Sequence, residues 1–160
     1  MAQAMMKPSL QGELEVDVEI KAPPRKFYHM LTAPQDLTEA TPDFLQGYSV
    51  KEGDVGRVGN LITWDYVLDG KPQVVTEKIE AMDPKNNMIQ FREVEGDLMK
   101  EFTSLLFTMH VNPKQGGPGG VVKWHIAYER INENVAHPEN LLQMCVKLSK
   151  DMDEMLLSKE

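Results

Sequence analysis

Cysteine and long apolar runs are scarce in this 160-residue sequence, which contains a single cysteine, Cys145. One thiol excludes an internal disulfide and is typical of proteins in a reducing compartment, so we predict a cytoplasmic location. No segment approaches the ~18 consecutive apolar residues that a transmembrane helix needs, and the N-terminal segment lacks the apolar core of a secretory signal. We therefore expect no membrane partner.

Positive charge is also in short supply, with 17 Lys and Arg against 25 Asp and Glu and a net charge of −8. Affinity for nucleic acids comes largely from clustered cationic side chains that neutralise phosphates. Because an acidic surface repels polyanions, we predict no nucleic-acid partner.

Metal-binding and nucleophile motifs are missing as well. The four histidines have no spacing such as H-E-x-x-H, and His110 and His125 fall on the polar face of alternating segments. Neither a Ser-His-Asp nor a Cys-His arrangement has a local signature, and Cys145 belongs to an apolar helical stripe. The sequence therefore predicts no metal site and no cofactor.

The composition that remains, 41% apolar and 26% charged, is typical of a soluble globular protein. We predict one ligand-binding domain over residues 1–160, with residues 1–8 disordered. In LQGELEVDVEI, which starts at Leu10, apolar and acidic side chains alternate strictly. This period of two predicts a half-buried strand, with its apolar face toward a core.

Residues 22–46 change to a helical pattern. Phe27, Met30 and Leu31 share one helical face, and Pro34 suits a first helical turn. We predict two short helices with a bend between them.

From about residue 46 to residue 132 the signals are those of strands and turns. Asp69-Gly70 is the strongest hairpin signal, because both central residues of a type I′ turn need positive φ. Residues 112–120 form a long glycine-rich hairpin tip. From Pro138 to about Leu157 the period becomes 3.6, which predicts one long amphipathic helix.

The predicted order is one strand, two short helices, six more strands and a long helix. A single antiparallel sheet has one apolar face to cover, and only the long helix is large enough to cover it. The fold class is therefore α+β, with a seven-stranded curved antiparallel sheet around a long C-terminal helix.

Three glycines, Gly53, Gly56 and Gly59, lie in the segment EGDVGRVGN. A phosphate-binding loop would need G-x-x-x-x-G-K-[ST] before a helix, whereas here a strand follows and no such Lys-Ser or Lys-Thr pair is present. We interpret the glycines as a tight connection that needs positive φ and close backbone approach.

GDVGRVGNLITWDYVLDGK, together with EGDLMKEF, VNPK and VKWHIAYERINE, resembles the plant major latex protein family, a branch of the birch pollen allergen superfamily. The resemblance covers about residues 9 to 158. It implies a helix-grip fold of the START-like type and a large internal cavity for hormones, steroids, terpenoids, flavonoids, alkaloids or other small hydrophobic molecules. Some members of the superfamily are cofactor-free enzymes.

One departure from the family pattern affects the expected ligand. Where the family commonly has Gly-Ser-Ile-Lys, this chain has Gly59, Asn60, Leu61 and Ile62. A ligand carboxylate loses a cationic partner there, so neutral ligands are favoured.

Methionine and aromatic side chains on the inward faces suit an adaptable cavity wall, although a densely packed core would use the same residues. We predict the following ligand-binding residues: Phe27, Met30, Leu31, Ile62, Trp64, Tyr66, Phe91, Leu105, Phe107, Met109, Trp124, Tyr128, Met144, Leu148 and Met152.

Glu77 and Glu101 are candidate catalytic residues, because strand parity places both inward and burial would raise a carboxyl pKa toward neutrality. A bulge that reverses parity, or pairing with a Tyr or Lys, is the alternative. His29, near the expected cavity mouth, is a third candidate.

Two functions remain open from sequence. The first is a carrier or defence-related protein that binds small hydrophobic metabolites, and the second is a cofactor-independent cyclase or isomerase of specialised metabolism that uses the same cavity. We expect a monomer or weak dimer.

Overall fold

The computed structural model describes residues 9–159, so the disorder predicted for residues 1–8 lies outside the described residues. The strands are β1 (Gln11–Ile20), β2 (Leu45–Glu52), β3 (Leu61–Leu68), β4 (Lys71–Asp83), β5 (Met88–Gly96), β6 (Phe102–Pro113) and β7 (Gly120–Arg130). The helices are α1 (Pro24–Leu31), α2 (Pro34–Ala40) and α3 (Glu139–Ser158), with short 3-10 helices η1 (Pro84–Asn86) and η2 (Asp97–Lys100).

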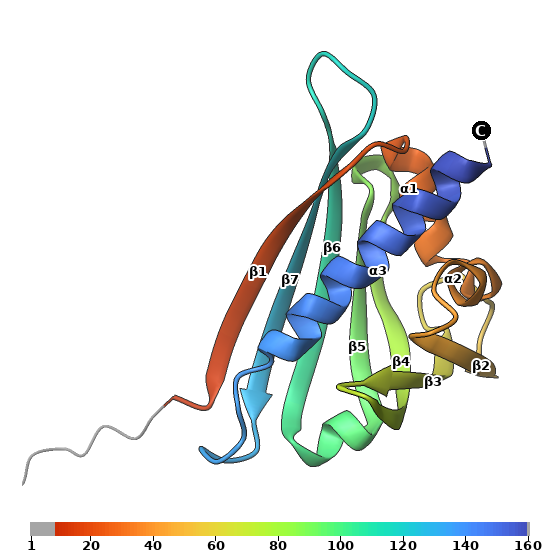
Figure 1. Cartoon of the computed structure of the whole chain (residues 1–160). Helices are drawn as coiled ribbons and strands as arrows, with labels where there is room; N and C mark the ends of the chain where they lie inside the picture. Colours follow the sequence, from red (N-terminus) through yellow and green to blue (C-terminus); the bar gives the residue numbers. More distant parts are fainter. Residues whose placement is uncertain (1–8, 160) are drawn as a thin grey trace, which may run out of the picture.

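The strands form one antiparallel seven-stranded sheet in the order β1-β7-β6-β5-β4-β3-β2. Each strand from β2 to β6 pairs with the strand that follows it in the sequence, and β1 pairs with the free edge of β7. Helix α3 lies across one face of this sheet (Figure 1). Helices α1 and α2 lie near the C-terminal half of α3. The predicted fold class and element order are confirmed.

Strand parity follows the sequence pattern where the strands are regular. Val18 and Ile20 of β1 are buried, and so are the inward residues of β7, Val122, Trp124 and Ile126. The predicted hairpin at Asp69-Gly70 also forms, with φ angles of 52° and 77°. The period-two interpretation is therefore confirmed in these strands.

Helix α3 buries Leu141, Cys145, Ser149 and Met152, whereas Leu148, predicted for the buried stripe, is only partly buried. A serine is tolerated here because its Oγ donates to the Cys145 carbonyl at 2.8 Å and accepts the Trp124 indole N–H at 2.7 Å. In the sheet, α3 packs mainly on β1 and β7, and it also contacts α1 and α2. Between α3 and strands β3, β4 and β5, the interior is therefore occupied by side chains and by the cavity described below.

The segment around residue 98 differs from the predicted strand. Gly96 has a φ of 110°, and the chain then forms η2, which buries Leu98. Asp97 fixes this turn by accepting the Val74 N–H at 2.8 Å. Strand β6 begins only after this turn.

Candidate ligand-binding site

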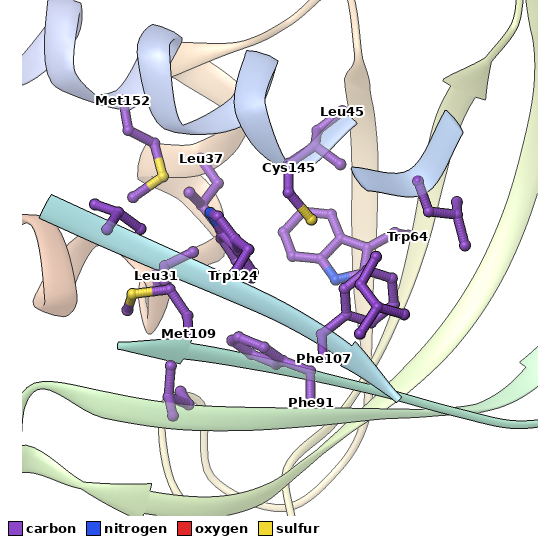
Figure 2. Packing of buried hydrophobic residues seen from close by; sticks show 14 of the residues in the cluster. Leu31, Leu37, Leu45, Trp64, Phe91, Phe107, Met109, Trp124, Cys145 and Met152 are labelled. Atoms are coloured by element: carbon purple, nitrogen blue, oxygen red, sulfur yellow. The ribbon is translucent and has the colours of Figure 1, made fainter. Parts of the chain in front are cut away.

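A cavity of about 90 Å³ lies between α3, the α1–α2 corner and the inner face of the sheet. Figure 2 shows Cys145 pointing from α3 toward Trp64, with Phe91 and Phe107 on the strands nearby. Apart from two glutamates, the lining is made almost entirely of apolar and aromatic side chains. The lining residues are Leu31, Leu37, Phe44, Leu45, Trp64, Tyr66, Val75, Glu77, Phe91, Glu93, Leu98, Phe107, Trp124, Met144, Cys145 and Leu148.

Many residues predicted as ligand-binding are brought together in this wall. Ile62 lines a narrower adjoining space of about 10 Å³ that runs from the α1–α2 corner to Glu77. The predicted residues in the main cavity are Leu31, Trp64, Tyr66, Phe91, Phe107, Trp124, Met144 and Leu148.

The other predicted residues face inward but lie outside the cavity wall. Phe27, Met30, Leu105, Met109 and Met152 are in the packed core, each no more than 4% exposed. They do not line the cavity, because α3, α1 and the sheet pack closely at these positions. Strand parity distinguishes inside from outside, but it does not show where along the strand a helix is in contact.

Tyr128 is also inward without reaching the cavity. Its hydroxyl is hydrogen bonded to Nδ1 of His137, in the segment before α3. Its ring packs edge-on against Phe102. Tyr128, which we predicted to be a ligand-binding residue, therefore lies outside the cavity wall.

The cavity is smaller than the resemblance implied. Pockets that hold drug-sized ligands usually measure about 300–1,000 Å³, against about 90 Å³ here. Met144 and Leu148 are half-buried on α3, so these two flexible side chains form the part of the wall nearest solvent. A ligand larger than a few water molecules requires such side chains to move.

Glu77 is the predicted carboxylate that the structure places in the cavity. It follows Val75 on the inner face of β4, and its Oε1 accepts the Trp64 indole N–H at 2.9 Å. Burial raises the pKa of Glu77, while hydrogen bonds from Glu93 and Trp64 act in the opposite direction. This carboxyl group therefore titrates above the usual glutamate range.

Glu93 is the cavity residue that the sequence analysis missed. It is 5% exposed and lies opposite Glu77 in the β4–β5 register. Burial, the charge of Glu77 and a hydrogen bond to Glu77 raise the pKa of Glu93 well above its ordinary value. The pKa of Glu93 therefore lies above the usual glutamate range, and the two carboxyl-bearing residues lie opposite each other on paired strands. Its position two residues after inward-facing Phe91 was a usable signal.

Tyr66 adds a third polar group to the cavity. Its side chain is 3% exposed, and its hydroxyl has no hydrogen-bond partner among the described residues. Burial and then the charge of Glu93 raise the pKa of Tyr66, so the phenol stays neutral. An unpaired buried hydroxyl costs free energy, which a suitable ligand would recover.

The remaining catalytic candidates lie outside the cavity. Glu101 is exposed, and its predicted inward placement is wrong because η2 shifts the start of β6 to Phe102. His29 is exposed on α1, since Phe27 and Met30 occupy the buried face of that helix. Neither residue lines the cavity or the adjoining space.

The glycine-rich loop supports one side of the site. Gly53, Gly56 and Gly59 have φ angles of 79°, 80° and 93°, as the interpretation of a tight connection requires. A Cβ on Gly56 would lie 3.0 Å from the Thr32 carbonyl oxygen in the α1–α2 bend. Buried Asn60 closes the loop by accepting the Gly56 N–H and donating to the Glu52 carbonyl. The loop forms part of the wall of the adjoining space through Asn60, and the Gly56 N–H is already bonded to the Asn60 side chain.

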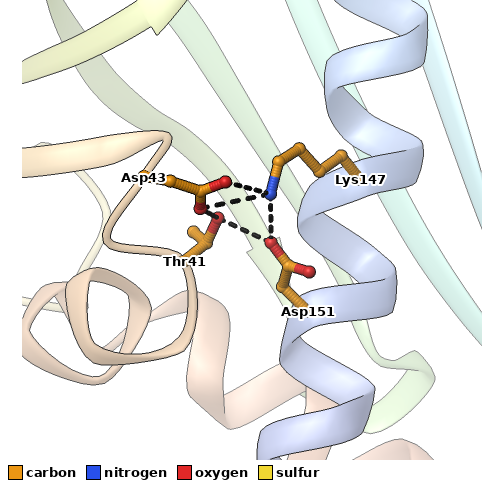
Figure 3. A network of polar contacts seen from close by, with 4 residues as sticks. All are labelled: Thr41, Asp43, Lys147 and Asp151. Atoms are coloured by element: carbon orange, nitrogen blue, oxygen red, sulfur yellow. Dashed lines mark hydrogen bonds and ion pairs between the residues drawn. The ribbon is translucent and has the colours of Figure 1, made fainter.

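A polar network joins the segment before β2 to α3 beside the cavity (Figure 3). Lys147 pairs with Asp43 at 3.1 Å and with Asp151 at 2.6 Å, and the buried Thr41 hydroxyl donates to Asp151 at 2.7 Å. The hydrogen bond to Lys147 lowers the pKa of Asp43. Because Phe44 and Leu45 follow directly and line the cavity, the network positions that wall.

A seven-stranded antiparallel sheet crossed by a long C-terminal helix, with an apolar cavity between them, defines a helix-grip protein. The chain belongs to the pathogenesis-related protein Bet v 1 family, whose model matches residues 9–159. No helix among residues 9–159 is long and apolar enough to cross a membrane.

The similar proteins are major latex proteins. MLP-like protein 43 of Arabidopsis thaliana is 53% identical over 153 residues, which cover 95% of this chain and 97% of that protein. MLP-like protein 28 of the same plant is 54% identical, but the chain spans only 46% of its length. The crystal structure of ginseng major latex-like protein 151 from Panax ginseng has a TM-score of 0.87 at 33% identity and covers 93% of this chain and 99% of that one.

Proposed function

We propose that this protein binds small hydrophobic plant metabolites in the cavity beneath α3, as a carrier or defence-related protein. The observation that carries the proposal is a cavity wall of aromatic and aliphatic side chains that contains only a few polar groups, among them Glu77 and Glu93. Apolar burial at about 25 cal/mol per Å² supplies the affinity, and the polar groups supply orientation. Family membership supports ligands of the hormone, steroid, terpenoid, flavonoid or alkaloid type. A cytoplasmic location and a monomer or weak dimer remain predictions.

The test uses Nile red, a neutral dye whose fluorescence increases in an apolar environment. Met144→Trp inserts a large side chain into the cavity wall, so we expect dye affinity to fall at least tenfold. Met155→Trp is the matched control, because Met155 is half-buried on the same helix outside the cavity wall. Equal dye binding by the wild type and Met144→Trp would place the binding site elsewhere.

Cofactor-free catalysis, as a cyclase or isomerase, is the second candidate function. It is favoured by two opposed carboxyl groups with raised pKa values inside an apolar cavity. A protonated carboxyl group beside an ionisable one can give a proton to a bound molecule at one atom and accept one at another. General acid–base catalysis of this kind contributes roughly 10²–10⁴-fold to a rate.

A plant metabolite extract separates the two functions. Mass spectrometry after incubation would identify compounds that the protein retains and compounds that it converts. Catalysis predicts a conversion that Glu77→Gln slows at least a hundredfold while retention is unchanged, with exposed Glu101→Gln as the control. Retention without any conversion by the wild type would contradict the enzyme and leave the carrier.

A further inference from the structure

The Glu77–Glu93 pair places two carboxyl groups in the cavity wall without a cationic partner. None of the ion pairs in the described part of the chain includes either residue. The neighbouring Arg92 alternates to the opposite face of the sheet, where it pairs with Glu80 and Ser104. Once Glu77 ionises, the cavity holds one negative charge in apolar surroundings.

The other titratable groups that face the pair are neutral near pH 7. Tyr66 faces it from β3, and burial raises the pKa of its phenol. Cys145 faces it from α3, and burial followed by the charges of Glu93 and Glu77 raises the pKa of its thiol. Neither group can serve as a counter-ion, and both are harder to ionise because of the carboxyl pair.

Unused hydrogen-bonding capacity accompanies this charge. Glu93 Oε2 and the Tyr66 hydroxyl are both buried, and neither has a partner within residues 9–159. Glu77 accepts the Trp64 indole N–H, which leaves further acceptor sites on its carboxyl oxygens. The cavity thus presents acceptor oxygens from three strands, β3, β4 and β5, and it gains a negative charge when Glu77 ionises.

We propose, on the basis of the ligand-binding function above, that the preferred ligand is an amphipathic primary amine in its ammonium form. The ammonium group binds among Glu77, Glu93 and Tyr66, and the apolar body lies against the aromatic wall. An ammonium has three N–H donors, which matches the three acceptor groups. Attraction between the cation and the faces of aromatic rings such as Trp64 adds to its affinity.

Three probes of similar size but different charge test this inference: 2-phenylethylamine, 2-phenylethanol and 3-phenylpropanoate. Calorimetric titration at pH 7.5 should give at least tenfold tighter binding of the amine than of the alcohol, with the carboxylate weakest. Lowering the pH should weaken the binding of the amine as Glu77 becomes protonated, and it should leave the binding of the alcohol unchanged.

Substitutions then locate the selectivity. Glu77→Gln and Glu93→Gln each remove a carboxylate at nearly constant shape, so we expect the preference for the amine to fall at least fivefold while alcohol affinity is retained. Exposed Glu101→Gln should leave all three affinities unchanged. A preference for the amine that survives in both cavity variants would overturn the inference.

The outcomes separate the inference from the proposed function. Equal binding of amine and alcohol by the wild type would reject the ammonium site but keep a cavity for small apolar molecules. If none of the three probes binds and Nile red binding is also absent, the cavity function itself fails. The wild-type comparison needs no variant, so misfolding of a variant cannot obscure the result.

Discussion

The indole N–H of Trp124 on β7 donates to the Ser149 hydroxyl of α3 at 2.7 Å, and both residues are buried. Ser149→Ala leaves this N–H without a partner in the interior, at a cost of about 1–3 kcal/mol in the free energy of unfolding. Chemical denaturation would measure the loss. Ser158→Ala is the control, because Ser158 makes a similar bond to a backbone carbonyl but is exposed, and it should change stability by less than about 0.5 kcal/mol.

We expect the contribution of Glu93 to the free energy of unfolding to decrease as the pH rises, which is opposite to the usual behaviour of a glutamate. Because its pKa is higher in the folded state than the ordinary value of 4.5, the folded protein binds more protons than the unfolded chain above that pH. Stability is therefore greatest below about pH 4.5 with respect to this group, and it falls as the pH rises toward the folded-state pKa.

Glu93→Gln removes that contribution. Denaturation of the wild type and the variant between pH 4 and pH 8 should show the variant gaining stability relative to the wild type as pH increases. The difference between the two proteins cancels the groups with lowered pKa values, such as Asp43 and Asp97. A difference that is constant over this range would contradict a raised pKa for Glu93.

Asp153 fixes the corner between β1 and α1 by accepting the backbone N–H groups of Lys21 and Ala22 at distances of 2.8–3.1 Å. Asp153→Ala leaves both donors without this partner, and we expect a loss of about 1–3 kcal/mol in thermal or chemical unfolding. Glu154→Ala removes an exposed carboxylate from the next position of α3 and should be close to neutral.

The glycine loop allows a comparison of two equal substitutions. Gly59→Ala adds a Cβ at positive φ with no atom within 4 Å, which costs about 1 kcal/mol from the backbone alone. Gly56→Ala has the same backbone cost and also crowds the Thr32 carbonyl oxygen, so we expect about 1 kcal/mol more. Equal losses of stability in the two variants would mean that the α1–α2 bend can move away from the added Cβ at no cost in free energy.

Much of the fold was predictable because its strands are regular. Alternation in β1 and β7 and the turn at Asp69-Gly70 are local patterns, and each has one geometric solution. Alternation along β5 likewise predicts that Glu93, two residues after the inward-facing Phe91, faces inward. The failure at Glu101 came from η2, where a short buried turn at Leu98 interrupts a pattern that otherwise reads as strand.

The depth of each residue in the interior was not predictable. Met109 and Leu148 both lie on apolar faces, yet Met109 is fully buried in the core and Leu148 lines the cavity. The difference depends on where α3 contacts the sheet, which is set by long-range packing against β1, β7 and the short helices. The Glu77–Glu93 contact likewise depends on the β4–β5 register and its bulges.

Helix α3 presents two sets of apolar side chains, one packed in the core and one lining the cavity. Leu141 and Met152 anchor the helix in the core, whereas half-buried Met144 and Leu148 meet the cavity. On the proposed ligand-binding function, we expect substitutions of Met144 and Leu148 to alter ligand preference with little loss of stability. A small library randomised at these two positions would be a practical starting point for biosensors built on this scaffold.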